Sequence, residues 1–399
     1  MFLEDRETSM PGKKLKILIV AGEASGDLHG GGLVESMKGL HPDCRFFGVG
    51  GKKMRKAGVQ TFFDIDRMGA VGVIEVLGEL PHFINIYRTL CSEIASGGYD
   101  AAILIDYPTL NLRLAKVCKR AGCPVFYFIS PQIWAWRKGR IKHIHQTVNR
   151  MFVVLPFEET LYREAGVDAE FLGHPFADMV RPTLKKEDAL REFGLDPEKK
   201  IIGLLPGSRK NEIQSLLEVM LEAAEKIQHK LGNCQFVLPV ADSIDPGLIR
   251  QRLQGNPLNI LLVTGKNYDV MNCSDFLIIA SGSATLEAGI LGCPMVIVYK
   301  LNPLTYWLAK ILVDTEMIGL VNIVAGEKVV AELIQEEVTA ENIAREAVAV
   351  LGNPERQRFV RERLLKIKET LGEPGVMERV ARSISLYLDK PIGNEKIPV

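Results

Sequence analysis

Runs of consecutive apolar residues alternate with helix-like segments along most of the chain. The first half contains KILIVA, FFGVG, AAILID, VFYFIS and MFVVL, and the second half contains IIGLLP, QFVLPV, NILLVT, FLIIAS and MVIVY. An unalternated apolar run is typical of a parallel strand covered on both faces, so each set predicts one doubly wound α/β sheet. We therefore expect two Rossmann-like domains facing a cleft.

The segment between the two sets of strands has a different composition. Residues 173–200 are richer in proline and charge than their flanks, which favours a linker with its boundary between Arg181 and Glu187. The prediction is a flexible N-terminus over 1–14, a first domain over 15–182 and a second domain over 187–365. The charged first residues do not resemble a signal peptide.

Composition excludes several classes of protein. Lysine plus arginine and aspartate plus glutamate each total 49, which argues against a dedicated nucleic-acid binder. The seven scattered cysteines form no CxxC pair and indicate free thiols in a reducing cytoplasm. No apolar stretch reaches the ~20 residues of a spanning helix, so we expect a protein that is soluble or lies on a membrane surface.

Five unusual segments follow predicted strands: GEASGD, DYPTLN, SPQIWAWR, PGSRKNE and SGSATLE. Ligands of open parallel sheets bind at the carboxyl ends of the strands, so these loops are expected to build the site. The first loop lacks the G-x-G-x-x-G spacing of a dinucleotide fingerprint, and no acid follows the second strand to hold a ribose. Both observations argue against a nicotinamide-dependent oxidoreductase.

Acidic side chains dominate the loops of the first half. Glu23 and Asp27 would repel a diphosphate but would hydrogen-bond well to neutral sugar hydroxyls. The candidate acceptor-side residues are therefore Glu23, Ser25 and Asp27, with Trp136 and Arg137 from a later loop. An alternative for Asp27 is that it favours the positive end of its own helix, with Ser25 as N-cap. Asp106 follows the buried run AAILI and could take a proton from a bound hydroxyl. Its alternative is local turn chemistry, although Pro108 leaves the capping position to Tyr107.

One part of this neutral chain is strongly basic. Between Asp106 and Glu158 every acidic or basic residue is basic: Arg113, Lys116, Lys119, Arg120, Arg137, Lys138, Arg140, Lys142 and Arg150. Such a stretch is either ordinary solvated surface or the contact for an anionic partner, such as a phosphate or an acidic lipid surface. Trp134 and Trp136, beside Arg137, are either core residues or a platform for a sugar or lipid, and we favour the platform.

An apolar stripe precedes the basic stretch. Residues at helical spacing within 68–90 are Val73, Leu77, Leu80, Ile84 and Tyr87. The stripe is wider than one buried face requires, and Pro81 is expected to kink or break it. The segment is therefore either two core helices or a contact for acyl chains and membrane.

The loops of the second half predict an anion site. Arg209 follows one strand, and Ser281, Gly282 and Ser283 follow another at a helix start. Two helix N-termini and one guanidinium would bind a diphosphate without a metal. Glu287 lies four residues after Ser283, which suits a ribose or sugar diol better than a capping box.

Other kinds of site are not indicated. No HExxH or G-x-S-x-G motif occurs, and neither a metal nor a cofactor is expected. His143 and His145 diverge if they lie on a helix, and His29 and His174 are better explained as structural than as catalytic residues.

GEASGD, PQIWAWR, LGHPF, LLPGSR and SGSATLE, in this order, resemble the lipid-A-disaccharide synthases from about Lys16 to the C-terminus. This family has the GT-B fold and inverts the anomeric centre without a metal. The resemblance implies transfer from UDP-2,3-diacylglucosamine to 2,3-diacylglucosamine 1-phosphate (lipid X), which yields UDP and a β-1,6 disaccharide in lipid A and lipopolysaccharide biosynthesis. The implied location is the cytoplasmic side of the inner membrane, as a peripheral protein on an anionic surface.

The resemblance also assigns roles to single residues. Asp106 matches the essential acid of the family. The implied donor-side positions are Arg209, Ser281, Gly282, Ser283, Ala284, Thr285, Glu287, Asn322 and Gln335. Two positions depart from the family pattern, because Val321 stands where proline is common and Leu110 stands where phenylalanine is common.

Further implications concern the C-terminus and the rival functions. The helix near Met377–Leu388, within about 370–390, is expected to cross back to the first domain, and some family members form homodimers by exchanging C-terminal domains. The alternatives are another GT-B enzyme, such as a UDP-N-acetylglucosamine epimerase, or a non-catalytic nucleotide-binding module.

Overall fold

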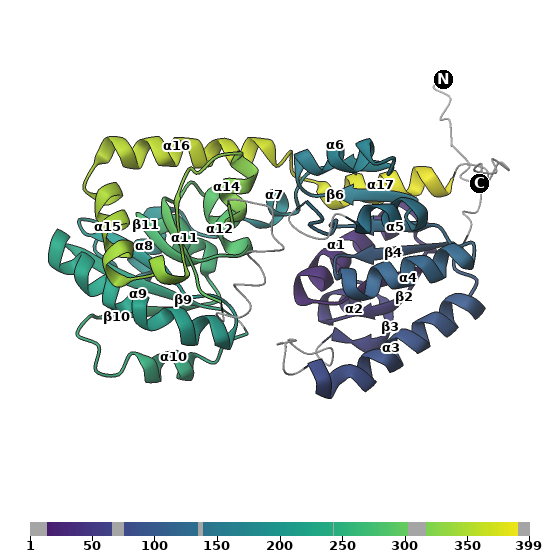
Figure 1. Ribbon diagram of the computed structural model, residues 1–399, viewed down its shortest axis with the longest axis horizontal. Coiled ribbons are helices and arrows are strands. Elements are labelled where there is room, and N and C mark those ends of the chain that lie inside the picture. The colour runs from purple at the N-terminus through teal and green to yellow at the C-terminus, as the bar shows by residue number, and fades with distance from the viewer. Residues whose placement is uncertain (1–13, 66–75, 135–138, 242, 302–316, 390–399) are drawn as a thin grey trace, which may run out of the picture. The chain divides into compact units, whose positions relative to one another are not determined.

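The computed structural model describes residues 14–65, 76–134, 139–241, 243–301 and 317–389. The chain forms two compact units, one from residues 1–175 with 373–399 and the other from residues 176–372 (Figure 1). Each unit contains one parallel sheet between helices. The prediction of two doubly wound α/β domains is therefore confirmed.

The first unit has a seven-stranded parallel sheet with the strand order β3-β2-β1-β4-β5-β6-β7. Its strands are β1 (Lys16–Ala21), β2 (Arg45–Gly50), β3 (Val59–Asp64), β4 (Ala101–Ile105), β5 (Val125–Phe128), β6 (Arg150–Val153) and β7 (Ala169–Phe171). The order reverses between β1 and β4, which are neighbours with Ala21 beside Ile105. This switch point is where an open α/β sheet binds ligands.

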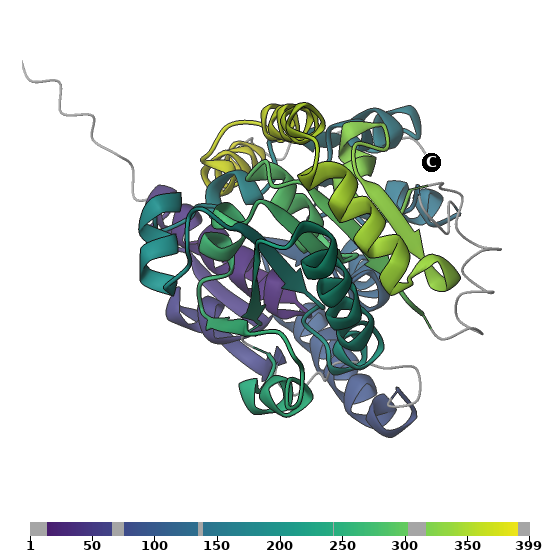
Figure 2. The ribbon, with the colours of Figure 1, turned by 90° about the vertical axis from the view of Figure 1, so that its left-hand side faces the viewer.

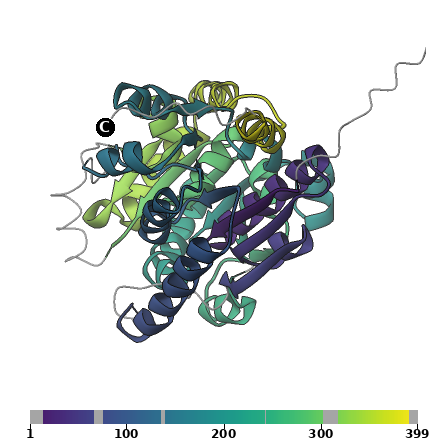
Figure 3. The ribbon, with the colours of Figure 1, turned by 90° about the vertical axis from the view of Figure 1, so that its right-hand side faces the viewer.

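Helices cover both faces of the first sheet. They are α1 (Ala24–Leu40), α2 (Lys52–Lys56), α3 (Val76–Ser96), α4 (Pro108–Arg120), α5 (Arg140–Thr147), α6 (Pro156–Glu164) and α17 (Val376–Leu388). Helices α3, α4 and α5 share one apolar core with the sheet. On the other face, α1 and α17 pack side by side, as Figure 3 shows in purple and yellow.

The second unit has a six-stranded parallel sheet with the order β10-β9-β8-β11-β12-β13. Its strands are β8 (Lys200–Leu205), β9 (Cys234–Val240), β10 (Ile260–Thr264), β11 (Phe276–Ala280), β12 (Met295–Tyr299) and β13 (Ala331–Ile334). The switch point lies between β8 and β11, which pair in parallel. The loops that carry Arg209 and Ser281 therefore leave from adjacent strands.

Helices also cover both faces of the second sheet. They are α7 (Phe176–Met179), α8 (Lys186–Phe193), α9 (Lys210–Leu231), α10 (Pro246–Arg252), α11 (Asn267–Cys273), α12 (Ser283–Ile290), α14 (Leu320–Ala325), the 3-10 helix η2 (Gln335–Glu337), α15 (Ala340–Leu351) and α16 (Pro354–Thr370). Helices α9 and α15 lie side by side on one face (Figure 2). Helices α12, α14 and α16 pack on the other face.

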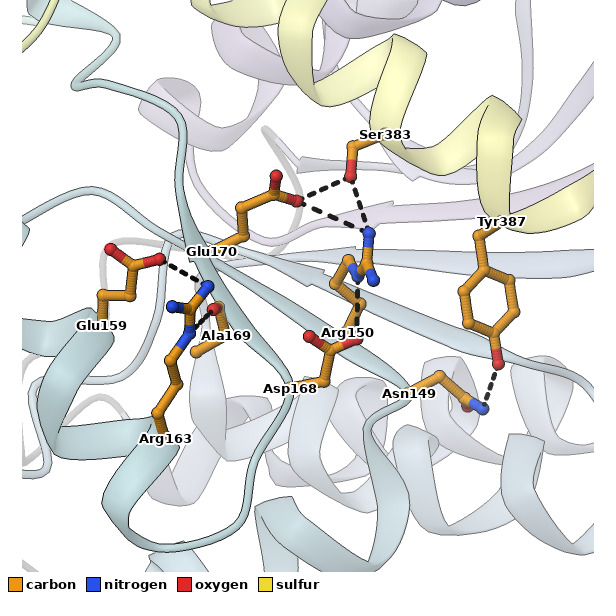
Figure 4. A network of polar contacts seen from close by, with 9 residues as sticks. All are labelled: Asn149, Arg150, Glu159, Arg163, Asp168, Ala169, Glu170, Ser383 and Tyr387. Atoms are coloured by element: carbon orange, nitrogen blue, oxygen red, sulfur yellow. Dashed lines mark hydrogen bonds and ion pairs between the residues drawn. The ribbon is translucent and has the colours of Figure 1, made fainter.

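Polar contacts fasten α17 to the edge of the first sheet (Figure 4). The Ser383 hydroxyl donates to Glu170 Oε2 at 2.7 Å and accepts from Arg150 Nη1 at 3.0 Å. The Arg150 guanidinium also pairs with Asp168 at 2.9 Å, and Asn149 donates to the Tyr387 hydroxyl at 3.0 Å. The C-terminal helix is thus an integral part of the first unit.

The structure differs from the sequence predictions at two boundaries. The second unit begins at 176 rather than near Arg181–Glu187, because Phe176 and Val180 are buried in its core. Helix α3 continues through Pro81, so the expected break is absent. Pro81 is the sixth residue of α3, and its missing amide removes one backbone hydrogen bond from the helix. Among the described helices, none is long and apolar enough to cross a lipid bilayer.

Candidate active site

Asp106 lies directly after β4, at the switch point of the first sheet, in a strained backbone conformation. Asp106 and Tyr107 have φ angles of 47° and 44°, in the left-handed region that costs a residue with a side chain on the order of 1 kcal/mol. The Asp106 carbonyl accepts hydrogen bonds from Tyr127 Oη at 2.6 Å and Asn111 Nδ2 at 2.8 Å. Two buried side chains therefore hold this conformation in place.

The carboxyl of Asp106 is poised to exchange a proton near neutral pH. Burial, reinforced by the negative charge of Glu23, raises the pKa of Asp106 to about 6. Glu23 begins α1 and is exposed, as is Ser25. A carboxylate with this pKa is a stronger base than an ordinary aspartate and is still largely ionised at pH 7.

The glycine that precedes Glu23 allows the two loops to approach each other. A Cβ on Gly22 would lie 2.3 Å from the ring of Tyr107, so only glycine leaves room for this ring. The sequence expected Glu23 and Ser25 to face a sugar. Their exposure beside Asp106 is compatible with that role, which stays a prediction.

Asp27 lies in the first turn of its own helix, as the alternative expected, but the N-cap residue is Glu23 rather than Ser25. Its side chain is 5% exposed, and its oxygens accept from the backbone amides of Gly51 at 2.6 Å, Lys53 at 2.9 Å and Met54 at 3.0 Å. The carboxylate therefore caps α2, a helix later in the chain. The expected contact with carbohydrate is wrong because these amides occupy the carboxylate.

The aromatic and basic loop after β5 is only partly described. Trp136 and Arg137 lie outside the described residues. Trp134 is half-buried, donates its indole N–H to Glu158 Oε1 at 3.0 Å and packs edge-on against the exposed Phe157, so its role as a platform stays a prediction. Burial raises the pKa of Glu158 to about 7.

The four histidines considered in the sequence either contact a backbone carbonyl or are buried. On α5, His143 contacts the Leu112 carbonyl and His145 contacts the Gly166 carbonyl, so the two rings diverge as expected. Burial lowers the pKa of His29 to about 4 and that of His174 to about 3, which keeps both rings neutral. The described residues bring no three His, Cys, Asp or Glu side chains together as potential metal ligands.

Arg209 is the N-cap residue of α9, at the switch point of the second sheet. Its side chain is 71% exposed and forms an ion pair of 3.1 Å with Glu212. At the neighbouring switch-point loop, Gly282 begins α12, with exposed Ser283 next to it. Tyr299, at the end of β12, has a pKa raised chiefly by burial and also by Glu212, while Arg209 opposes the rise. The phenol of Tyr299 is therefore close enough to interact electrostatically with Glu212 and Arg209.

At the start of α12, Gly282 and Ser283 are exposed, whereas Thr285 is buried. Thr285 is fully buried and donates from Oγ1 to the Gly282 carbonyl at 2.8 Å, whereas Ala284 is half-buried. Ser281 donates to the Ile318 carbonyl at 3.2 Å. The hydroxyls of Thr285 and Ser281 thus shape the loop, and Ser283 remains open to a ligand.

Glu287 is a half-buried carboxyl one turn into α12. Burial raises its pKa to about 7, and its charge contributes to raising the pKa of Tyr268 to about 12. Among the described residues no hydrogen bond to its carboxyl group is found. An acid in this state suits a neutral hydrogen-bonding partner such as a diol.

The side-chain amides of Asn322 and Gln335 form hydrogen bonds within the protein. Asn322 is 0% exposed, donates to Val330 O at 2.9 Å and to Glu332 Oε1 at 2.8 Å, and accepts from the amides of Val329 and Val330. Gln335 bonds both polar groups of Leu301, at 2.6 and 3.1 Å. The expected direct contact of Asn322 with a donor is therefore wrong, because its amide makes all four of its hydrogen bonds within the protein. Gln335 uses only one of its two N–H groups in these bonds, and its contact with the donor stays a prediction.

The apolar stripe before β4 is described in part. Val73 lies outside the described residues, and Leu77 and Leu80 belong to α3, where only the backbone is described. Ile84 is 38% exposed, and Tyr87 is half-buried. Helix α4 packs beside α3 and exposes the basic residues Arg113, Lys116, Lys119 and Arg120.

Sequence reasoning missed Tyr127, Asn111 and Glu212. No local pattern reveals that Tyr127 and Asn111 hold the Asp106 carbonyl. Glu212, in contrast, lies three residues after the helix-capping position of Arg209, and this spacing is a recognisable signal.

Two lipid-A-disaccharide synthases are similar in sequence to this chain over nearly its whole length. It is 47% identical over 377 residues to the lipid-A-disaccharide synthase of Geobacter sulfurreducens, covering 94% of this chain and 98% of that protein. It is 44% identical over 366 residues to the lipid-A-disaccharide synthase of Syntrophus aciditrophicus, covering 92% and 96%.

Solved structures share the fold. A putative UDP-N-acetylglucosamine 2-epimerase from Listeria monocytogenes matches with a TM-score of 0.65 and 14% identity, over 97% of this chain and 100% of that chain. CalG4, the calicheamicin glycosyltransferase, matches with a TM-score of 0.61 and 14% identity, over 96% and 100%. These likenesses support the GT-B fold and do not discriminate between the two activities. The model of the family "Lipid-A-disaccharide synthetase" matches residues 17–381, and the chain belongs to this family.

Proposed function

We propose that this protein joins UDP-2,3-diacylglucosamine to lipid X, which yields the β-1,6-linked disaccharide 1-phosphate and UDP. Family membership supports the activity, and relatives named lipid-A-disaccharide synthase support it across nearly the whole chain. The observation that carries the mechanism is the Asp106 carboxyl. Its backbone is fixed at the switch point of the first sheet, and its pKa is raised to about 6.

In the proposed reaction Asp106 is the general base. Its carboxylate takes the proton from the 6-hydroxyl of lipid X as this oxygen attacks the anomeric carbon of the donor. The new C–O bond forms opposite the departing bond, so the configuration inverts, and the electron pair of the broken bond leaves with the β-phosphate of UDP. Exposed Glu23 and Ser25 lie at the same loop edge and are the proposed contacts to acceptor hydroxyls.

The second unit is the proposed nucleotide side. The guanidinium of Arg209 and the backbone amides at the starts of α9 and α12 are the donors for the diphosphate, and no step is assigned to a metal. Glu287 is the proposed partner for ribose hydroxyls, since its half-buried carboxyl lacks a hydrogen-bonding partner among the described residues.

The proposed membrane contact is the surface of α3 and α4. Exposed Ile84 lies on α3, and exposed Arg113, Lys116 and Arg120 lie on the helix packed beside it. Apolar side chains next to basic ones suit an anionic lipid surface. Co-sedimentation with anionic vesicles should weaken when Arg113 and Lys116 are both replaced by glutamate.

Product analysis tests the proposed function directly. The protein is incubated with UDP-2,3-diacylglucosamine and lipid X, and the products are weighed by mass spectrometry. The proposal predicts the tetraacylated disaccharide 1-phosphate and an equal amount of UDP. An epimer of the UDP-sugar, which has the same mass and is identified by NMR, without a disaccharide would favour an epimerase, and chemically unchanged substrates would contradict both activities.

A further inference from the structure

The carboxylate of Glu212 lies where the second unit is proposed to bind an anion. Its Oε2 atom accepts from the backbone amides of Ser208 at 2.9 Å and Arg209 at 3.1 Å, and its Oε1 atom accepts from Arg209 Nη1 at 3.1 Å. Two loop amides and one guanidinium therefore already hold a negative charge. The Arg209 guanidinium and the amides at the start of α9 are also the donors that we assign to the diphosphate.

The loop is built to admit this carboxylate. Gly207 has a φ of +113°, and a Cβ added to it would lie 2.2 Å from Glu212 Oε2. A side chain at 207 is therefore excluded both by backbone conformation and by contact with the glutamate. On the other side, the Ser243 hydroxyl donates to the Ser208 carbonyl at 2.7 Å. The donor amides are thus fixed in place around the carboxylate.

Exposure of the pair permits exchange with a ligand. The side chain of Arg209 is 71% exposed, whereas that of Glu212 is 24% exposed. Surface ion pairs of this kind are weak, so a ligand with a greater negative charge can displace the carboxylate from the guanidinium. Glu212 occupies a helix-capping position, but a neutral glutamine would fill that position as well. The hydrogen bonds of the cap therefore do not need the negative charge, whose structural contribution is the favourable interaction with the N-terminus of α9.

We propose that Glu212 is an internal substitute for the diphosphate. It neutralises Arg209 when the nucleotide is absent, yields the guanidinium when the nucleotide binds, and takes it back when UDP leaves. The displaced carboxylate remains tethered close to the phosphates, and the repulsion weakens UDP binding and favours product release. This inference rests on the proposed role of Arg209 as a diphosphate ligand.

The test is the affinity for UDP, measured by isothermal titration calorimetry. Glu212→Gln retains an oxygen that can accept from the loop amides but removes the charge. Two like charges a few ångströms apart in a solvated site correspond to about a fivefold effect, so this variant should bind UDP about fivefold more tightly than wild type. The inhibition constant of UDP in the transfer assay should fall by a similar factor.

Glu218→Gln is the matched control. It removes the same charge from an exposed position of the same helix and should leave UDP affinity within twofold. Glu212→Ala, which also lacks the charge, provides a second reading if Glu212→Gln does not fold. A purely structural role for Glu212 would weaken UDP binding or leave it unchanged.

The outcomes separate this inference from the proposed function. Unchanged or weaker UDP binding by folded Glu212 variants, together with a loss of binding in Arg209→Ala, would overturn only the role of Glu212. Unchanged UDP binding by Arg209→Ala would instead refute the diphosphate site itself. Tighter binding by the Glu212 variants and weaker binding by Arg209→Ala would support both.

Discussion

The hydroxyl of Tyr127 donates a 2.6 Å hydrogen bond to the backbone carbonyl of Asp106. The phenol is fully buried beneath a residue whose φ is 47°, so this bond fixes an otherwise unfavourable conformation. Asn111 adds a second bond to the same carbonyl at 2.8 Å. The direction of the Asp106 carboxyl is therefore set by residues that are not expected to touch the substrate.

Removing the Tyr127 hydroxyl tests this positioning. We expect Tyr127→Phe to lower the free energy of unfolding by about 1 kcal/mol, since one buried hydrogen bond is lost. The kcat should fall about tenfold with little change in KM, because the base is misplaced while substrate contacts remain. Tyr99→Phe is the control, because its buried phenol bonds Glu93 instead. A kcat equal to that of this control would contradict the positioning role.

Glu23 should set the pH at which the enzyme gains activity. Because a base must be deprotonated to act, and the pKa of Asp106 is about 6, the rate should fall as the pH drops through 6. Glu23→Gln removes a neighbouring negative charge, which lowers the pKa of Asp106 and moves this limb of the pH–rate profile to lower pH. Ser25→Ala should leave the limb in place, and an unmoved limb in Glu23→Gln would exclude the electrostatic coupling.

Asp106 should reduce stability at high pH. Its pKa is raised from 3.8 to about 6 in the folded protein, so the folded state binds the proton more tightly than the unfolded state does. The resulting stabilisation is complete below about pH 4 and is lost as the pH rises through 6, at a cost of about 3 kcal/mol. Asp106→Asn should therefore melt at a higher temperature than wild type at pH 8, with the difference shrinking toward pH 4.

The matched control for this comparison is Asp43→Asn. Asp43 is exposed, so this substitution should not produce a pH-dependent gain. Equal melting temperatures of wild type and Asp106→Asn at pH 8 would show that ionised Asp106 carries no burial cost.

Asp27 should matter for folding. Asp27→Ala removes the acceptor for three backbone amides at the start of α2, and we expect a loss of about 2–4 kcal/mol in the free energy of unfolding. Ser25→Ala, two residues earlier on an exposed position, should change it by less than about 0.5 kcal/mol. Urea denaturation measures both, and a loss below 1 kcal/mol for Asp27→Ala would contradict the capping role.

The central strands were predictable because they are buried on both faces. All ten predicted runs form strands, whereas β3, β7 and β13 were missed. Each of these three lies at the edge of its sheet, where polar residues such as Gln60, Glu170 and Glu332 interrupt the apolar run. An edge strand has less apolar surface to bury, so its sequence carries a weaker signal. The fourth edge strand, β10, was predictable because no charged residue interrupts its run ILLVT.

The site was predictable only where the chemistry is local. The strand-end positions of Asp106 and Arg209 follow from the apolar runs before them. The partners of Asp27, Asn322 and Gln335 lie in other loops, at Gly51, Val330 and Leu301, and the sequence alone does not reveal them. Polar residues at loop edges bind ligands or fix the backbone, and only the three-dimensional partners distinguish the two roles.

The most direct measurement of the central claim compares turnover and UDP affinity in Asp106→Asn. The account predicts a fall in kcat of about 100- to 10,000-fold, with UDP affinity within twofold of wild type, because the base acts on the acceptor and the nucleotide is held by the second unit. Near-normal turnover in this variant would contradict the assignment of Asp106 as the base.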